Sequence, residues 1–174
     1  MLIADLLAPD LQLIFCGTAL SRASFAAKAY YAKPGNRFWP TLAAVGLTPY
    51  RFAPNQYRQL LDLGIGLTDL CKVHYGNDDQ LPKGSLDALA LREKLRTFRP
   101  RRVAFTSKNA GQAALSRKVS SYGRQPECLE GAEIWVLPSP SGLASKFWDP
   151  HPWQQLALSV GAGVSEVTDL PPLA

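Results

Sequence analysis

The sequence lacks the residues that most metal centres and disulfide frameworks need. Its 174 residues contain three scattered cysteines, Cys16, Cys71 and Cys128, and two histidines, His74 and His151. A disulfide framework uses an even set of cysteines, and an iron–sulfur cluster uses four thiolates. The histidines add no spacing typical of metal ligands. We therefore expect no metal and no cofactor.

Long hydrophobic runs and a glycine-rich nucleotide loop are also missing. No apolar run approaches the roughly 20 residues of a membrane-spanning helix, and the start of the chain has no basic region like that of a signal peptide. We expect a cytoplasmic protein without membrane contact. The stretch from Gly64 to Gly66 lacks the third glycine of G-x-G-x-x-G, which argues against a dinucleotide site.

The composition is that of a globular protein, with 47% hydrophobic and 19% charged residues. The length suits one domain, which we place at residues 1–160, followed by a loosely packed tail at residues 161–174. The net charge of +5 allows a polyanionic partner, although many ordinary proteins share such a balance.

Apolar strands and amphipathic helices alternate along the chain, which predicts an α/β fold. We expect a single domain whose mainly parallel central sheet of about four strands is flanked by helices. The strands are predicted at 11–16, 65–71, 102–106 and 133–138, and the helices at 38–45, 54–63, 85–98, 109–116 and 148–159. Ser85 is the expected N-cap of the third helix.

Parallel sheets bind ligands beyond the carboxyl ends of their strands. The segments that emerge there begin at Gly17, at Thr68-Asp69 and at Ser139. The loop at residues 19–36 is long for a compact domain, which is typical of a functional segment.

Three stretches resemble the mismatch-specific uracil/thymine DNA glycosylases, a family of the uracil-DNA glycosylase superfamily. The first is Phe15-Cys-Gly-Thr-Ala-Leu-Ser21, and it is followed by Tyr31-Ala-Lys-Pro-Gly-Asn-Arg-Phe-Trp39. The family patterns are F-C-G-I-N-P-G and P-x-N-R-F-W. Val136-Leu-Pro-Ser-Pro-Ser-Gly-Leu-Ala-Ser145 is similar to V-L-P-N-P-S-G-L-S, and Gly64-Ile-Gly-Leu-Thr-Asp-Leu70 to G-x-G-[IV]-T-x-L. The resemblance covers residues 6–153.

This resemblance implies a monofunctional, monomeric glycosylase of base excision repair with a uracil-DNA glycosylase-like fold. Such an enzyme flips uracil, or thymine or another damaged base, out of mismatched double-stranded DNA and hydrolyses it away to leave an abasic site. The implied base-binding residues are Gly17, Thr18, Ala19, Ser24, Tyr31 and Asn36. The implied DNA contacts are Arg22, Ser139, Ser141, Gly142, Leu143, Ala144, Ser145 and Lys146.

Two of these implied roles have a structural alternative. Tyr31 matches the aromatic that stacks on the flipped base, but an aromatic side chain is more often ordinary core. Leu143 matches the apolar wedge that fills the vacated base stack. In the alternative, Leu143 belongs to a plain turn between a strand and a helix and returns to the core.

The sequence departs from the family at the residue that handles water. In the family, the asparagine of G-I-N-P-G holds the attacking water, whereas this chain has Ala19, and Ser139 replaces the asparagine of N-P-S-G-L. Breaking a glycosidic bond builds positive charge on the sugar, so a nearby carboxylate helps as base and as counter-charge. Asp69 is our candidate. Its alternative role is to cap a turn or to pair with Lys72 or Arg37.

Two other functional classes remain open at this stage. A non-catalytic protein that binds DNA mismatches or lesions is favoured by the missing asparagines. A small-molecule hydrolase or nucleotide-binding protein is also open, although the chain has no phosphate loop or catalytic triad motif. We expect the acidic run Asn77-Asp78-Asp79 to be a solvated loop.

Overall fold

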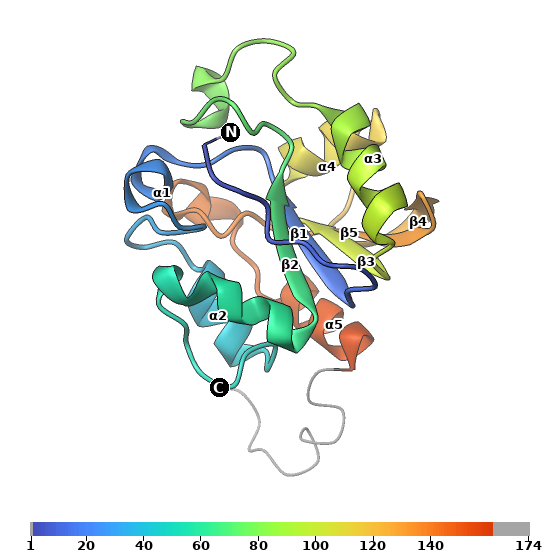
Figure 1. Ribbon diagram of the computed structural model, residues 1–174, viewed down its shortest axis with the longest axis horizontal. Coiled ribbons are helices and arrows are strands. Elements are labelled where there is room, and N and C mark those ends of the chain that lie inside the picture. Colours follow the sequence, from blue (N-terminus) through green and yellow to red (C-terminus); the bar gives the residue numbers. More distant parts are fainter. Residues whose placement is uncertain (1, 162–174) are drawn as a thin grey trace.

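A five-stranded sheet forms the centre of the protein in the computed structural model, which describes residues 2–161 (Figure 1). The strand order is β2-β1-β3-β5-β4, and neighbours are parallel except for the antiparallel pair β4 and β5. The strands are β1 (Leu13–Gly17), β2 (Ile65–Asp69), β3 (Arg102–Phe105), β4 (Gly123–Leu129) and β5 (Ala132–Val136). The predicted α/β class and mainly parallel sheet are confirmed.

The fifth strand of the sheet, β4, lies in a stretch where no strand was predicted. β4 lies at the edge of the sheet, where alternate side chains face solvent, and it carries a register shift between Arg124 and Cys128. An edge strand tolerates Pro126 and charged residues, so it has no continuous apolar run. The predicted tail at residues 161–174 lies outside the described residues, apart from Gly161.

Helices cover both faces of the sheet. The α-helices are α1 (Arg22–Ala27), α2 (Phe38–Ala44), α3 (Ala88–Phe98), α4 (Lys108–Leu115) and α5 (His151–Val160). The 3-10 segments are η1 (Pro54–Leu63), η2 (Asp78–Gln80) and η3 (Gly142–Phe147). No helix among residues 2–161 is long and apolar enough to cross a membrane.

Two of the predicted helices need correction. The N-cap of α3 is Asp87, whose carboxylate accepts the Ala90 N–H at 2.9 Å, and not Ser85. The last helix begins at His151 and not at Trp148, with Pro152 in its first turn, where proline is well tolerated. The helix predicted at residues 54–63 is present with those bounds, in 3-10 geometry. The predicted loop at 19–36 contains the short helix α1, which the Ser21 hydroxyl caps by accepting the Ser24 N–H.

Two apolar cores lie on opposite faces of the sheet. On one face, α2 and α5 pack through Phe38 and Trp153 against Phe15 of β1. On the other face, α3 and α4 pack through residues such as Leu95 and Ala110 against β3 and β5. Because β1 and β2 are buried along their whole length, their carboxyl ends have fixed positions at one edge of the sheet.

Candidate active site

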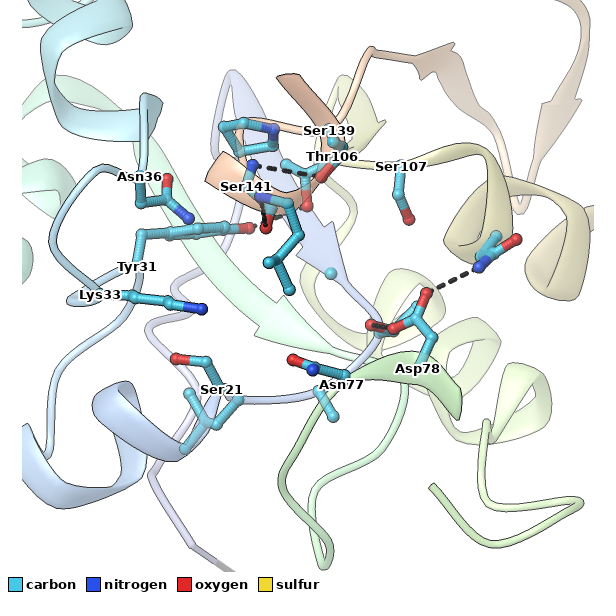
Figure 2. Close-up of a pocket in the computed structure, with 18 of the residues that line it drawn as sticks. Ser21, Tyr31, Lys33, Asn36, Asn77, Asp78, Thr106, Ser107, Ser139 and Ser141 are labelled. Atoms are coloured by element: carbon cyan, nitrogen blue, oxygen red, sulfur yellow. Dashed lines mark hydrogen bonds between the residues drawn. The ribbon is translucent and has the colours of Figure 1, made fainter. Parts of the chain in front are cut away.

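A cavity of about 660 Å³ opens at the carboxyl edge of the sheet (Figure 2). Residues that follow β1, β3 and β5 line it together with the end of β2, which is the arrangement expected for a parallel sheet. Tyr31, Lys33 and Asn36 lie along one wall and Asn77 and Asp78 along the opposite wall.

Most of the candidate residues gather in this cavity. Those that line it are Gly17, Thr18, Ala19, Ser24, Tyr31, Asn36, Asp69, Ser139, Ser141, Leu143 and Ala144. Those that do not are Arg22, Gly142, Ser145 and Lys146, all of which are exposed. Arg22 instead lies over the ring of Tyr75, with the guanidinium carbon 5.9 Å from the ring centroid.

Asp69 ends β2 beside Gly17 of β1, which is its register partner. The carboxylate is buried, and a Cβ on Gly17 would lie 2.7 Å from Oδ1. Only a glycine therefore allows the carboxylate this position. Within the described residues, Oδ2 has no hydrogen-bond partner and no salt bridge joins Asp69 to Lys72 or Arg37. The expected alternative, an ion pair with one of these residues, is wrong.

Burial raises the pKa of Asp69 from 3.8 to about 7, since a buried carboxylate loses its hydration. The positive charge of Lys72 lowers this pKa and the negative charge of Asp5 raises it. An acid with a pKa near neutrality can take a proton and release it again at working pH.

Near Asp69, the half-buried carboxylate of Asp5 contacts the two neighbouring lysines. Its oxygens lie 2.9 Å from Lys72 Nζ and 2.8 Å from Lys94 Nζ, and one of them accepts the Thr68 hydroxyl at 2.7 Å. Burial raises the pKa of Asp5, but the hydrogen bonds from Lys94 and Lys72 outweigh it and leave the pKa below its usual value. Because both lysines contact Asp5 directly, Asp69 has no ion-pair partner within the described residues.

The aromatic ring of Tyr31 lines the side of the cavity, and two contacts hold it in place. Its ring stacks on Phe38 with centroids 3.8 Å apart and 9° between the planes, and its hydroxyl shares a hydrogen bond of 3.1 Å with Thr106. The core packing that we considered as an alternative therefore applies to one face of the ring. The residue still lines the cavity.

Three other candidate residues, Asn36, Ser24 and Thr18, accept backbone hydrogen bonds from the loops around the cavity. The side-chain oxygen of Asn36 accepts the Phe38 N–H at 2.9 Å, so its amide NH2 is the group left for the cavity. The Ser24 hydroxyl accepts the Ala32 N–H at 3.0 Å, and the Thr18 carbonyl accepts the Cys71 N–H at 2.7 Å. The carbonyl of Thr18, one of the implied base-binding residues, therefore already accepts a backbone hydrogen bond.

Leu143 projects outward, with 68% of its side chain exposed. It lies in η3, whose first turn is held by the Ser141 hydroxyl accepting the Leu143 N–H at 3.2 Å. The alternative in which Leu143 returns to the core is wrong. Phe147, four residues further on, is 63% exposed and also lines the cavity.

Sequence reasoning missed the role of Asp78. This exposed residue, which we expected to be merely solvated, accepts the Thr18 hydroxyl at 2.6 Å and the Asn109 amide at 2.7 Å. It thus joins the loop after β1 to the start of α4 across the rim of the cavity. Its partners are 60 and 31 residues away, and no local pattern signals such contacts.

Across residues 2–161, no group of three or more histidine, cysteine or acidic side chains is placed to hold a metal ion. The polar groups of the cavity are hydroxyls, amides, carboxylates and the ammonium groups of Lys33 and Lys108. This set can bind a polar heterocycle and can move a proton.

Two comparisons with known proteins bear on the site. Residues 4–157 match the family described as the uracil DNA glycosylase superfamily. The fold is similar to a solution structure from Methanosarcina acetivorans of a protein named as a candidate uracil DNA glycosylase. The TM-score is 0.66 and the sequence identity 22%, and the match covers 91% of this chain and 96% of that chain.

Proposed function

The chain belongs to the uracil DNA glycosylase superfamily, and from this premise we propose that it is a monofunctional, mismatch-specific DNA glycosylase. It would remove uracil, and in addition thymine or another damaged base, from mismatched double-stranded DNA to leave an abasic site. In this proposal it acts as a monomer without metal or cofactor. The observation that carries the proposal is the buried carboxylate of Asp69 in the cavity wall, whose Oδ2 has no hydrogen-bond partner within residues 2–161.

Asp69 would serve as the general base. As the bond between C1′ and the base nitrogen breaks, the base leaves with the electron pair and the sugar becomes cationic. Water then forms the new bond to C1′ and gives its proton to the Asp69 carboxylate, which also stabilises the positive sugar. The departed base takes a proton from solvent. This assignment compensates for Ala19, whose methyl group cannot orient water.

The flipped base would stack on the face of Tyr31 opposite Phe38. Stacking of a base on an aromatic ring is worth about 1–3 kcal/mol, and the Phe38 stack with the Thr106 hydrogen bond keeps the ring in place beforehand. The amide NH2 of Asn36 would donate to a carbonyl oxygen of the base. Gly17 and Ala19 leave room because they carry little or no side chain.

The exposed side chain of Leu143 would enter the duplex as the base leaves it. Removing a base from its stack costs a few kcal/mol, and an inserted apolar side chain offsets part of that cost. A mismatched pair is easier to open than a matched one, which supports the preference for mismatches. The residues that would contact the strand around the wedge are Ser139, Ser141, Gly142, Ala144, Ser145 and Lys146. Arg22 on α1, which lies over the Tyr75 ring, would contact a phosphate elsewhere along the strand.

A protein that binds mismatches without cleaving them is the second candidate. It is favoured by one observation, the replacement of the family's two asparagines by Ala19 and Ser139. Mismatch-dependent affinity without base release would identify it.

The decisive experiment is a single-turnover assay with a labelled duplex that carries one G·U pair, followed by alkaline cleavage at abasic sites. We expect release of uracil, faster than from the matched A·U duplex. G·T and G·hypoxanthine duplexes in the same panel define the base preference. No cleavage of any duplex at high enzyme excess would refute the proposed activity.

A further inference from the structure

Arg37 connects two parts of the site that have different roles in the proposed reaction. One is the segment that carries the Leu143 wedge, and the other supports the ring of Tyr31. Its backbone N–H donates to the Pro140 carbonyl at 2.8 Å, and its Nη2 donates to the Ser145 hydroxyl at 3.1 Å. Its guanidinium carbon lies 5.3 Å from the ring centroid of Trp148. These three partners span residues 140–148, so the backbone and the side chain of Arg37 together contact both ends of the segment that carries Leu143.

The contact with Ser145 continues into the turn that presents the wedge. The Ser145 hydroxyl accepts from Arg37 and donates to the Gly142 carbonyl at 2.8 Å. Gly142 itself lies close to the Gly35 carbonyl, which would be 3.7 Å from a Cβ at that position. The backbone turn that presents Leu143 is therefore in contact with residues 35–37. The Leu143 side chain itself remains exposed to solvent.

On its other side, Arg37 continues directly into the support of the base pocket. The side-chain oxygen of Asn36 accepts the Phe38 N–H at the start of α2, and Phe38 stacks on Tyr31. The stacking ring of Tyr31 and the segment that carries Leu143 are thus both held by residues 36–38.

The guanidinium is held without a carboxylate partner within the described residues. Nη1 is buried and has no hydrogen-bond acceptor, and no salt bridge involves Arg37. A buried N–H donor without an acceptor is costly. A solvated lysine would avoid that cost, but it has neither the planar fork nor the flat face that reach Ser145 and Trp148 together.

From these contacts we infer that Arg37 is a positioning residue. It fixes residues 140–148, which carry the Leu143 wedge, relative to Tyr31 in the pocket that would receive the flipped base. This inference rests on the proposed function and deepens it. A fixed distance between Leu143 and Tyr31 matters when a base must be pulled out of a duplex. It matters much less when the base is already unpaired, since single-stranded substrate requires no wedge.

The test compares Arg37→Lys and Ser145→Ala with wild type on one labelled uracil strand, used alone and annealed opposite guanine. Leu143→Ala shows the effect of losing the wedge. The matched control is Arg101→Lys, because Arg101 is exposed and lies just before β3, at the end of that strand away from the cavity. We expect Arg37→Lys to lower the ratio of duplex to single-strand rates by about tenfold, the order expected for one lost charged hydrogen bond. Ser145→Ala should lower the ratio less, and the control should keep the wild-type ratio.

The double variant Arg37→Lys/Leu143→Ala adds a second readout. If Arg37 acts through the wedge, the double variant lowers the ratio no further than Leu143→Ala alone. Equal loss on both substrates, or an unchanged ratio in Arg37→Lys, overturns the inference.

Failure of the proposed function is a separate outcome. If wild-type protein releases no base from either substrate, the same variants are compared by their affinity for a duplex with a tetrahydrofuran abasic analogue opposite guanine. Weaker binding by Arg37→Lys, matched by Leu143→Ala, then supports the positioning role without any activity. Wild-type affinity in Arg37→Lys overturns it.

Discussion

Asp69→Asn should lower the activity of the protein and raise its stability. The substitution keeps the size of the side chain and removes its charge. The carboxylate is buried with Oδ2 unpaired, so as an anion it destabilises the fold. A group retained in such a place despite its cost is typical of a catalytic site.

The kinetic effect follows from the general-base role. Loss of one positioned base slows a reaction by about 10²-fold or more, so we expect a decrease of that order in the single-turnover release of uracil. Because the base form is the carboxylate, the wild-type rate should rise with pH around a midpoint near the Asp69 pKa of about 7. In Asp69→Asn this titration should disappear.

The effect on stability has the opposite sign. The pKa of Asp69 rises from 3.8 in the free side chain to about 7 in the fold, so the folded state binds the proton more tightly between these values. Stability contributed by this residue is therefore lost as pH rises through that window, and the cost is complete above pH 7. A shift of about 3 pKa units corresponds to at most about 4 kcal/mol. Asp69→Asn should exceed wild type in unfolding free energy by up to that amount at pH 8.

Urea unfolding at pH 5 and pH 8 measures this difference, and Asp62→Asn, an exposed acid on η1, is the matched control. We expect the gain of Asp69→Asn over wild type to be larger at pH 8 than at pH 5, with no comparable trend in the control. A less stable Asp69→Asn at pH 8 would show that the carboxylate is structural. A rate within about threefold of wild type, far below the loss expected for a general base, would remove it from the mechanism.

Three further predictions concern the surroundings of Asp69 and the base pocket. Lys72→Met should move the midpoint of the pH–rate profile upward, because the Lys72 charge lowers the Asp69 pKa; an unchanged or lower midpoint would contradict this. Tyr31→Ala should slow single-turnover base release by about 10- to 100-fold through lost stacking, whereas Tyr31→Phe should retain most of it; equal losses would argue against stacking. Ala19→Asn placed in Asp69→Asn should restore part of the rate in the G·U assay, and no gain over Asp69→Asn alone would show that the loop after β1 cannot hold the water.

Much of the fold could be predicted because its central strands are buried on both faces. β1, β2, β3 and β5 are short apolar runs followed by turns or polar residues, and such runs are visible in a single sequence. β4 pairs with β5 only along the sheet edge, so its residues are half exposed and resemble a loop. α1 has only six residues and one buried side chain, which is too little for a helical pattern.

The position of Asp69 could be predicted because it depends on a general rule, that parallel strands end at one edge of the sheet. That Asp69 forms no ion pair with Lys72 could not be predicted, because Lys72 pairs with Asp5 instead. Asp5 lies 67 positions from Lys72, and no local pattern indicates that the two meet. The contacts of Asp78 and Arg37 likewise join residues far apart in the sequence. Spacing along the chain reveals which residues share an edge, but not which of them touch.

The register pairs Gly17 with Asp69, and in the proposed mechanism a residue at either of these neighbouring strand ends could therefore hold the attacking water. Parallel strands lie about 4.8 Å apart, so side chains of similar length on either strand can reach one water position. If Asp69 is the general base, an acid on β2 removes the need for an asparagine after β1, provided that residue 17 is a glycine. In that case the water site, and not the residue that serves it, is the feature to compare between related sites.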